Sequence, residues 1–238
     1  MSFSLRTQAV VGVVLLVLFN IATIGLIWRA ESMSIAGATS VETRFAMLKE
    51  DVIPLGTHIK SIQIDVIQVQ QFLQDISATR GQDGLDGGFE EAAKFAKKFE
   101  EDVAAAHAIA VKLGRDDMRD KLDSARRAFV EFHQVGKEMA EAYVAGGPSA
   151  GNRMMEEFDM RSEAMSESLE ALLTIRDGII DGTTMAIGEE ISAVEKTISD
   201  TSTFTSAAAT VATLGLIFAA FAFLRFVVRP IGALTAVM

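Results

Sequence analysis

The stretch FAMLKEDVIPLGTHIKSIQIDVIQVQQFLQDI, residues 45–76, carries the heptad pattern that decides the fold. Its apolar side chains recur at alternating spacings of three and four residues, the period of a helix that buries one face against other helices. They are Phe45, Leu48, Val52, Leu55, Ile59, Ile62, Val66, Val69, Leu73 and Ile76, and Ala38 and Val41 extend the series backwards. The pattern predicts one long helix in an all-α protein.

Three further helical segments follow, and glycines mark the boundaries between them. They cover residues 89–113, residues 118–143 and a last stretch that begins near Asn152. Each has apolar residues at the same three- and four-residue spacing. Because short loops make sequential helices antiparallel neighbours, we expect an antiparallel four-helix bundle.

Two apolar runs without charges lie outside this bundle. The run FTSAAATVATLGLIFAAFAFL at residues 204–224 has about the 20 residues that a helix needs to cross ~30 Å of hydrocarbon. The run at residues 9–28 ends in Trp28, a residue type enriched at membrane interfaces. We expect both runs to span a membrane. A cleaved signal peptide is the alternative for the first run, because residues 36–38 have the A-x-A form of a cleavage site.

Charge is distributed unevenly along the 238 residues. Residues 29–202 hold all 32 acidic residues but only 19 of the 22 basic ones, and the other bases are Arg6, Arg225 and Arg229. Because basic residues collect on the cytoplasmic side of membranes, both termini are predicted in the cytoplasm and the acidic middle outside. The acidic middle disfavours nucleic-acid binding, and the absence of cysteine excludes disulfides and thiolate chemistry.

Helix lengths predict that the bundle stands on a two-helix stalk. The outer helices, with about 50 residues each outside the membrane, reach ~75 Å, whereas the inner two reach only ~36 to 45 Å. The distal bundle is therefore expected at about residues 55–178 and the stalk at residues 29–54 and 179–202. Pro54 and Gly178, two helix-weakening residues, fall at the junction. The apolar seams of such a stalk predict a parallel homodimer.

The apolar stripe of the last helix is predicted to change register at this junction. It runs through Phe158, Ser162, Met165, Leu169 and Leu172, slips by one residue around residues 176–178, and resumes at Ile180, Thr184, Ile187, Ile191, Val194 and Ile198.

No catalytic or metal-binding pattern stands out. His58, His107 and His133 occur singly on three helices, and none has the glutamate three residues earlier that a di-iron bundle would need. The acidic residues Asp83, Asp86 and Glu90 lack the alternation of a calcium loop, so turn and N-cap roles are favoured. We expect no enzyme, no metal and no cofactor.

A polar cluster at the distal end of the first helix is the strongest binding candidate. It comprises Gln70, Gln71, Gln74, Asp75, Ser77, Thr79 and Arg80. Heptad numbering places Arg80 on the core-facing line, where a buried guanidinium needs a partner. In one interpretation Arg80 caps its own helix or pairs with Asp83 or Asp86. In the other, Arg80 and either Arg153 or Arg161 clamp a small carboxylate ligand, with Gln70, Gln74, Ser77 and Thr79 beside it.

The end of the chain adds a relay motif. In VRPIGALTAVM, residues 228–238, Pro230 stands where a new amphipathic helix would start, just after the second span. This segment resembles the first helix of a HAMP relay domain, and residues 68–89 resemble the distal helix and turn of receptors with four-helix-bundle sensors. The chain as a whole resembles the sensory half of a bacterial methyl-accepting chemotaxis receptor.

This resemblance implies transmembrane signalling in chemotaxis. A periplasmic bundle would sense a small molecule or a periplasmic protein, and displacement of the last helix would pass through the second span to Arg225, Arg229 and Pro230. Pro54 and Gly178 would take part in this relay. The receptor would be a homodimer, and its full-length form would bind a coupling protein and a histidine kinase. The alternatives are an input module of a sensor histidine kinase or diguanylate cyclase, and a non-sensing membrane scaffold.

The expected fold is therefore all-α, with two transmembrane helices flanking an elongated antiparallel four-helix bundle on a two-helix stalk. The chain order is a cytoplasmic N-terminus (1–8), a first span (9–28), a periplasmic sensor domain (29–202), a second span (203–224) and the start of a HAMP relay (225–238) in the bacterial inner membrane. Because no second HAMP helix or signalling hairpin follows Met238, we expect a part of a longer receptor or a naturally truncated product.

Overall fold

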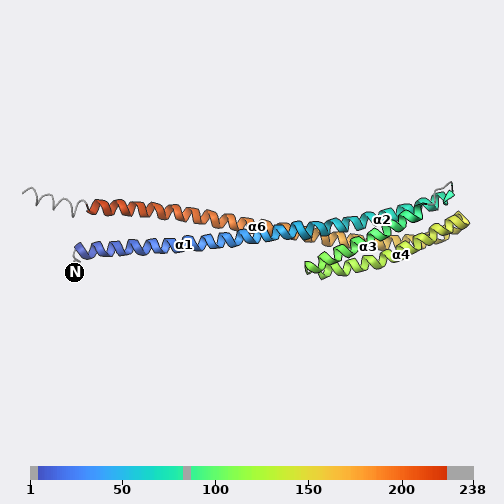
Figure 1. Ribbon diagram of the computed structural model, residues 1–238, viewed down its shortest axis with the longest axis horizontal. Helices are drawn as coiled ribbons and strands as arrows, with labels where there is room; N and C mark the ends of the chain where they lie inside the picture. The colour runs from blue at the N-terminus through green and yellow to red at the C-terminus, as the bar shows by residue number, and fades with distance from the viewer. Residues whose placement is uncertain (1–4, 83–86, 224–238) are drawn as a thin grey trace, which may run out of the picture. The chain divides into compact units, whose positions relative to one another are not determined.

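The computed structural model describes residues 5–82 and 87–223, and these residues form helices joined by short turns, with no strand among them (Figure 1). The elements are α1 (Leu5–Met47), η1 (Leu48–Val52), α2 (Ile53–Thr79), α3 (Gly88–Lys112), α4 (Asp116–Gly146), α5 (Pro148–Gly151), η3 (Asn152–Met154) and α6 (Met155–Phe223). The predicted all-α class is confirmed.

Two compact units make up the chain. We call Thr43–Ala186 the bundle unit, and it contains all of the predicted distal bundle, residues 55–178. We call the described residues up to Glu42 and from Ile187 onward the paired-helix unit.

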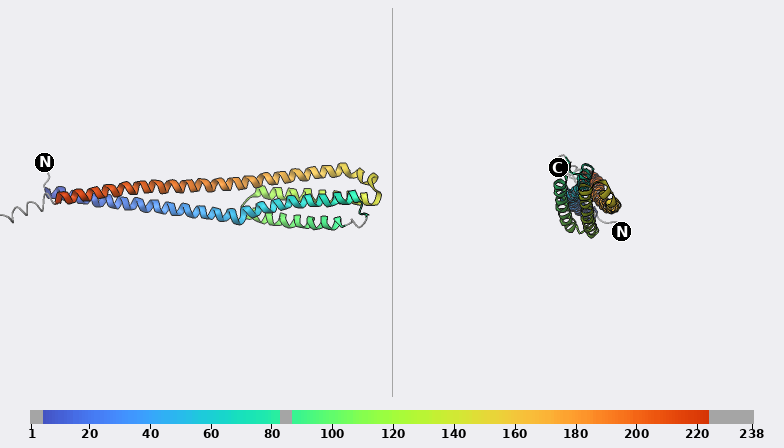
Figure 2. Two further views of the ribbon diagram at one scale, coloured as in Figure 1. Left: turned by 90° about the horizontal axis from the view of Figure 1, so that it is seen from above. Right: turned by 90° about the vertical axis from the view of Figure 1, so that its right-hand side faces the viewer.

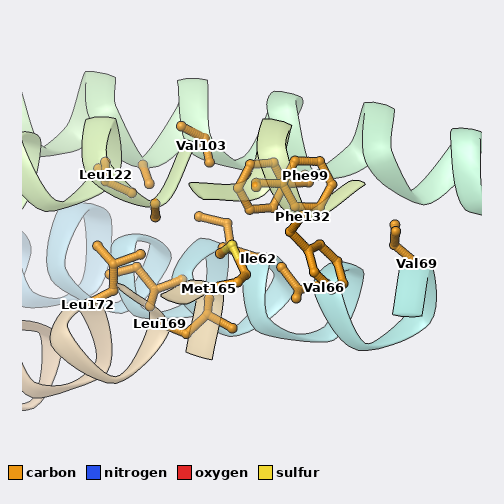
Figure 3. Packing of buried hydrophobic residues seen from close by; sticks show 14 of the residues in the cluster. Ile62, Val66, Val69, Phe99, Val103, Leu122, Phe132, Met165, Leu169 and Leu172 are labelled. Carbon is orange, nitrogen blue, oxygen red and sulfur yellow. The ribbon is translucent and has the colours of Figure 1, made fainter. Parts of the chain in front are cut away.

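In the bundle unit, α2, α3, α4 and the first part of α6 enclose one apolar core (Figure 2). The predicted heptad positions from Val52 to Ile76 are all buried. Aromatic rings fill the middle of the core, where the rings of Phe99 and Phe129 stack with their centroids 3.8 Å apart. Figure 3 shows Phe132 beside Phe99, with residues of α2 and α6 below them. The heptad pattern therefore identifies the core-facing side correctly from Val52 to Ile76. It is wrong at Phe45, which is 49% exposed, because the extra residue of the π turn at Leu48–Val52 interrupts the regular spacing.

Pro54 does not break the first helical run, because a π turn, η1, precedes it. Proline lacks an N–H and its ring crowds the carbonyl four residues earlier, so the helix widens here. The backbone N–H of Ile53 donates to the carbonyl of Leu48, five residues back. The extra residue in the turn leaves Asp51 buried, and Lys112 Nζ at the end of α3 donates to Asp51 Oδ1 over 2.6 Å.

Helix α6 continues through Gly178, and its inner face does not slip there as predicted. Beyond Leu172 the less exposed positions continue at regular helical spacing through Ile175, Ile179 and Thr183. Ile180 also packs against the core as predicted, but Thr183 rather than Thr184 continues the line, and its Oγ1 donates to the Ile179 carbonyl over 2.7 Å. The prediction was wrong because a threonine that satisfies its hydroxyl on its own helix can occupy an inner position.

In the paired-helix unit, α1 and the second part of α6 lie side by side (Figures 1 and 2). They approach so closely that a Cβ atom on Gly37 would lie 2.5 Å from Cγ2 of Val194. Small and hydroxylated residues occupy many of the least exposed positions, among them Ala30, Ser34, Thr197, Thr201, Thr205, Ala208, Ala212 and Gly215. Small residues allow close helix packing inside membranes as well as outside.

Ile191 and Ile198, predicted on the inner stripe of the last helix, are exposed in this unit. Ile187 and Val194, which belong to the same predicted stripe, do lie on the inner side, four residues before and three residues after Ile191. This register turns Ile191 and Ile198 outward.

One helical run among the described residues, Pro148–Phe218, contains a stretch long and apolar enough to cross a membrane. Only 6% of that stretch is buried, and Leu216, Ile217 and Phe218 are all exposed. The other predicted span, residues 9–28, forms part of α1, and its place in a membrane stays a prediction. The relay residues Arg225, Arg229 and Pro230 lie outside the described residues.

Candidate functional site

A groove opens between α2, α4 and α6 at the end of the bundle unit where α2 terminates; we call it the distal groove. Its volume is about 320 Å³. The groove is lined by Gln74, Ser77, Ala78, Met139, Tyr143, Met155, Phe158 and Asp159. Pockets of about 300 Å³ and more hold small-molecule ligands in proteins. The structure thus places two of the predicted binding residues, Gln74 and Ser77, in one groove.

Two glycines leave the space that shapes this groove. A Cβ atom on Gly136 of α4 would lie 2.8 Å from the Phe158 ring and 2.9 Å from a Leu73 methyl group. Gly151 in α5 is buried, and a Cβ atom there would overlap the ring of Tyr143. The absence of these two side chains lets Phe158 pack as the apolar floor and Tyr143 as part of the rim.

The polar atoms of the groove are mainly acceptors. Neither the Asp159 carboxylate nor the Gln74 amide has a hydrogen-bond partner in the part of the chain that the structure describes. Ser77 Oγ donates to the Leu73 carbonyl over 2.8 Å, and Tyr143 Oη donates to Asn152 Oδ1 over 2.5 Å. Since both hydroxyl protons are already used, only the lone pairs of these oxygens remain for a ligand.

The Arg80 side chain is not buried in the bundle as the heptad numbering predicted; it is exposed, and its Nη1 atom would lie 3.9 Å from a Cβ atom on Gly147 in the turn between α4 and α5. Arg80 is the C-cap of α2, in the left-handed conformation with φ 56° and ψ 31°, and its backbone N–H donates to the Ile76 carbonyl. Its Nη2 atom lies 3.3 Å from Gln82 Oε1. Because the helix ends at Thr79, helical spacing no longer sets the direction of Arg80, and the capping interpretation is confirmed. The alternative partners Asp83 and Asp86 lie outside the described residues.

The other predicted binding residues are dispersed. Arg161 Nη1 donates to Glu131 Oε2 of α4 over 2.5 Å, and Arg153 is exposed outside the groove. Gln70 is half-buried and does not line the groove. Thr79 Oγ1 donates to the Asp75 carbonyl over 2.9 Å and so helps to end α2. A clamp of two arginines on a carboxylate is therefore not assembled.

A second polar cluster, which the sequence analysis missed, lies between α2 and α3. Asp65 is only 4% exposed, and its Oδ2 atom has no hydrogen-bond partner among the described residues. Burial, followed by the charge of Asp102, raises the pKa of Asp65 to about 6, while Lys98 acts in the opposite sense. Asp102 also contacts a histidine, since its Oδ1 atom lies 2.6 Å from His58 Nδ1. The cluster can hold a proton between two carboxyl groups and respond to pH.

Sequence signals for the missed residues were weak but present. Asp65 is an acid that stands directly beside the core position Val66 in a helix with few acids. Met155 and Asp159 lie one helical turn apart at the start of the last helix, close to the glycine-rich turn before it. Only the packing of three helices shows that they share a groove with Gln74.

No family model, curated protein or solved structure matches the chain. Function is therefore inferred from the fold, the distal groove and the sequence motifs.

Proposed function

We propose that the chain is the sensory half of a bacterial transmembrane receptor of the methyl-accepting chemotaxis type, with the bundle unit in the periplasm. One observation carries this proposal: α6 supplies Met155, Phe158 and Asp159 to the groove and continues as one helix to Phe223, through the apolar stretch. A ligand that prefers one arrangement of the groove would displace this helix. The HAMP-like segment that starts at Pro230 would receive the displacement.

The proposed receptor is a two-pass protein of the inner membrane and a homodimer. Apolar side chains outside the predicted spans remain exposed, namely Met33, Ile35, Ile191 and Ile198 in the paired-helix unit and Ile53, Ile64 and Ile67 on α2. A second copy of the chain would cover such side chains. In a receptor of this type, a coupling protein and a histidine kinase would receive the signal through the HAMP relay.

The topology can be tested directly because the chain has no cysteine. We expect Ser166→Cys, on the exposed side of α6, to react with a membrane-impermeant maleimide in intact cells. Ala236→Cys should react only after the inner membrane is opened. Reaction of both cysteines in intact cells, or of neither, would contradict the proposed two-pass topology.

Signalling can be tested by restraining α6 against α1. In the pair Gly37→Cys and Val194→Cys the two Cβ atoms would lie 3.9 Å apart, so oxidation should join the two helices. The chain would be fused at Met238 to the HAMP and kinase-control region of a known chemoreceptor, and kinase activity would be measured in membranes. We expect oxidation to shift kinase activity and reduction to restore it. Unchanged activity after complete cross-linking would favour a passive scaffold.

A further inference from the structure

The distal groove has the chemistry of a site for a cation rather than for the carboxylate that the sequence suggested. Its lining residues include one acid, Asp159, and no lysine, arginine or histidine. Asp159 and Gln74 are exposed to the groove mouth without partners in the described residues. The negative charge of a carboxylate ligand would be repelled by Asp159, which would weaken its binding. The positive charge of an ammonium group would be attracted by Asp159, which would strengthen its binding.

The rest of the groove fits an apolar body. Phe158 and Met139 both line the groove and are each only 2% exposed, so they form its closed apolar floor. Met155 is 41% exposed and forms part of the rim. Thioether and aromatic side chains make favourable contacts with aromatic rings and adapt to different shapes. A ligand with a ring and a short alkyl arm therefore matches the floor and the rim.

We propose that the distal groove binds a small amphiphilic cation, with an ammonium group at Asp159 and Gln74 and an apolar body over Met139, Met155 and Phe158. This site rests on the proposed function, which it deepens by naming the ligand class. The acceptor lone pairs of Ser77 and Tyr143 supply further hydrogen bonds to the ammonium protons. The acidic surface of the middle part of the chain would attract such a cation before it binds.

The test is calorimetric titration of the full chain in lipid nanodiscs with three probes of similar shape. These are 2-phenylethylammonium, the neutral 2-phenylethanol and the anion 3-phenylpropionate. We expect the ammonium probe to bind at least about tenfold more tightly than the alcohol, a difference of about 1.4 kcal/mol. We expect no binding of the anion. Equal binding of the three probes, tighter binding of the anion, or no binding of the ammonium probe at millimolar concentration would overturn the proposal.

Two groove variants and one matched control identify the site. Asp159→Asn should weaken binding of the ammonium probe at least about tenfold and leave the affinity for the alcohol unchanged, because the substitution removes only the charge. Ala78→Leu should weaken binding of both the ammonium probe and the alcohol, because the larger side chain narrows the groove. Asp181→Asn, an exposed aspartate of α6 outside the groove, should change neither. Equal losses in Asp159→Asn and Asp181→Asn would reject the site. The maleimide and cross-linking tests involve no ligand, so the two proposals can fail separately.

Discussion

Asp65 is the residue that couples the packing of α2 on α3 to pH. Its pKa rises from 3.8 to about 6 in the folded chain. Between these values the folded state holds a proton that the unfolded state has released, so this stabilisation is complete below about pH 4 and is lost as the pH rises through about 6. As the pH rises through this window, we expect the ionisation of Asp65 to lower the free energy of unfolding by about 1–2 kcal/mol. Solvent screening makes this loss smaller than the pKa shift alone would give.

Asp65→Asn isolates this contribution, because asparagine keeps the shape of the side chain and does not titrate. The variant should gain stability relative to the parent as the pH rises from about 4 to about 7. Burial lowers the pKa of His133 below 6.5, so the contribution of this residue to stability rises with pH. Because His133 is present in both proteins, its contribution cancels in the difference between them. Thermal unfolding at a series of pH values checks the prediction, and a constant difference between the two proteins would contradict it.

Gly136 determines how closely α4 approaches the floor of the distal groove. In Gly136→Ala the new methyl group would crowd Phe158 and Leu73, at 2.8 and 2.9 Å. Overpacking of this kind costs roughly 1–3 kcal/mol, and the better helix propensity of alanine returns about 1 kcal/mol. We expect a net loss of up to about 2 kcal/mol in urea unfolding. Gly136→Ala should cost less free energy in a Phe158→Leu background, because the nearest ring atom is then absent. If the losses of the two single variants simply add in the double variant, the proposed contact between residues 136 and 158 is contradicted.

At the scale of elements, Gly178 and Gly182 offer a matched pair on α6. Both are exposed, and a Cβ atom on either would meet no other group within 4 Å. Alanine at each position should therefore raise the free energy of unfolding by about 0.5–1 kcal/mol. Amide hydrogen exchange in the adjoining turns of α6 should slow in both variants. Exchange that is unchanged in Gly178→Ala would show that this glycine does not weaken the helix.

The same pair tests the predicted relay role of Gly178. Gly56 of α2 packs on Arg176 and Ile180 of α6, which places Gly178 at the level of Pro54 and its π turn. If this level is where the relay bends, Gly178→Ala should reduce the response of the receptor hybrid to a stimulus, and Gly182→Ala should not. Equal responses would mean that the α6 relay works as a uniform rod.

Periodic packing is what the sequence predicts well in these helices. The positions from Val52 to Ile76 are buried as expected, because each apolar residue returns to the same face of a regular helix. The prediction fails where regular geometry ends, as at Arg80 in its left-handed cap. It also fails where a polar residue takes an inner position, as at Thr183 and Asp65. The groove escaped prediction for a third reason, since its lining comes from the ends of three helices whose contacts no single pattern encodes.

At the scale of the whole molecule, the exposed isoleucines of α6 bear on whether two chains act together. Ile191 is 37% and Ile198 is 53% exposed, seven residues apart on one side of the helix. Exposed apolar side chains at this repeat favour a helical partner. A parallel dimer with a twofold axis would bring each isoleucine close to its copy in the partner chain.

Ile198→Cys should therefore form a disulfide-linked dimer in oxidised membranes, visible on a non-reducing gel. Lys196→Cys lies on the opposite face of the same turn and is also exposed, so it matches Ile198→Cys in depth and access. It should form little dimer, since a disulfide needs Cβ atoms within about 4.5 Å. The yield at position 198 should persist when the protein is diluted with lipid, because a stable dimer does not depend on chance collisions. Equal yields at the two positions, or loss of the band on dilution, would mean that the isoleucine stripe faces lipid or solvent and not a second copy.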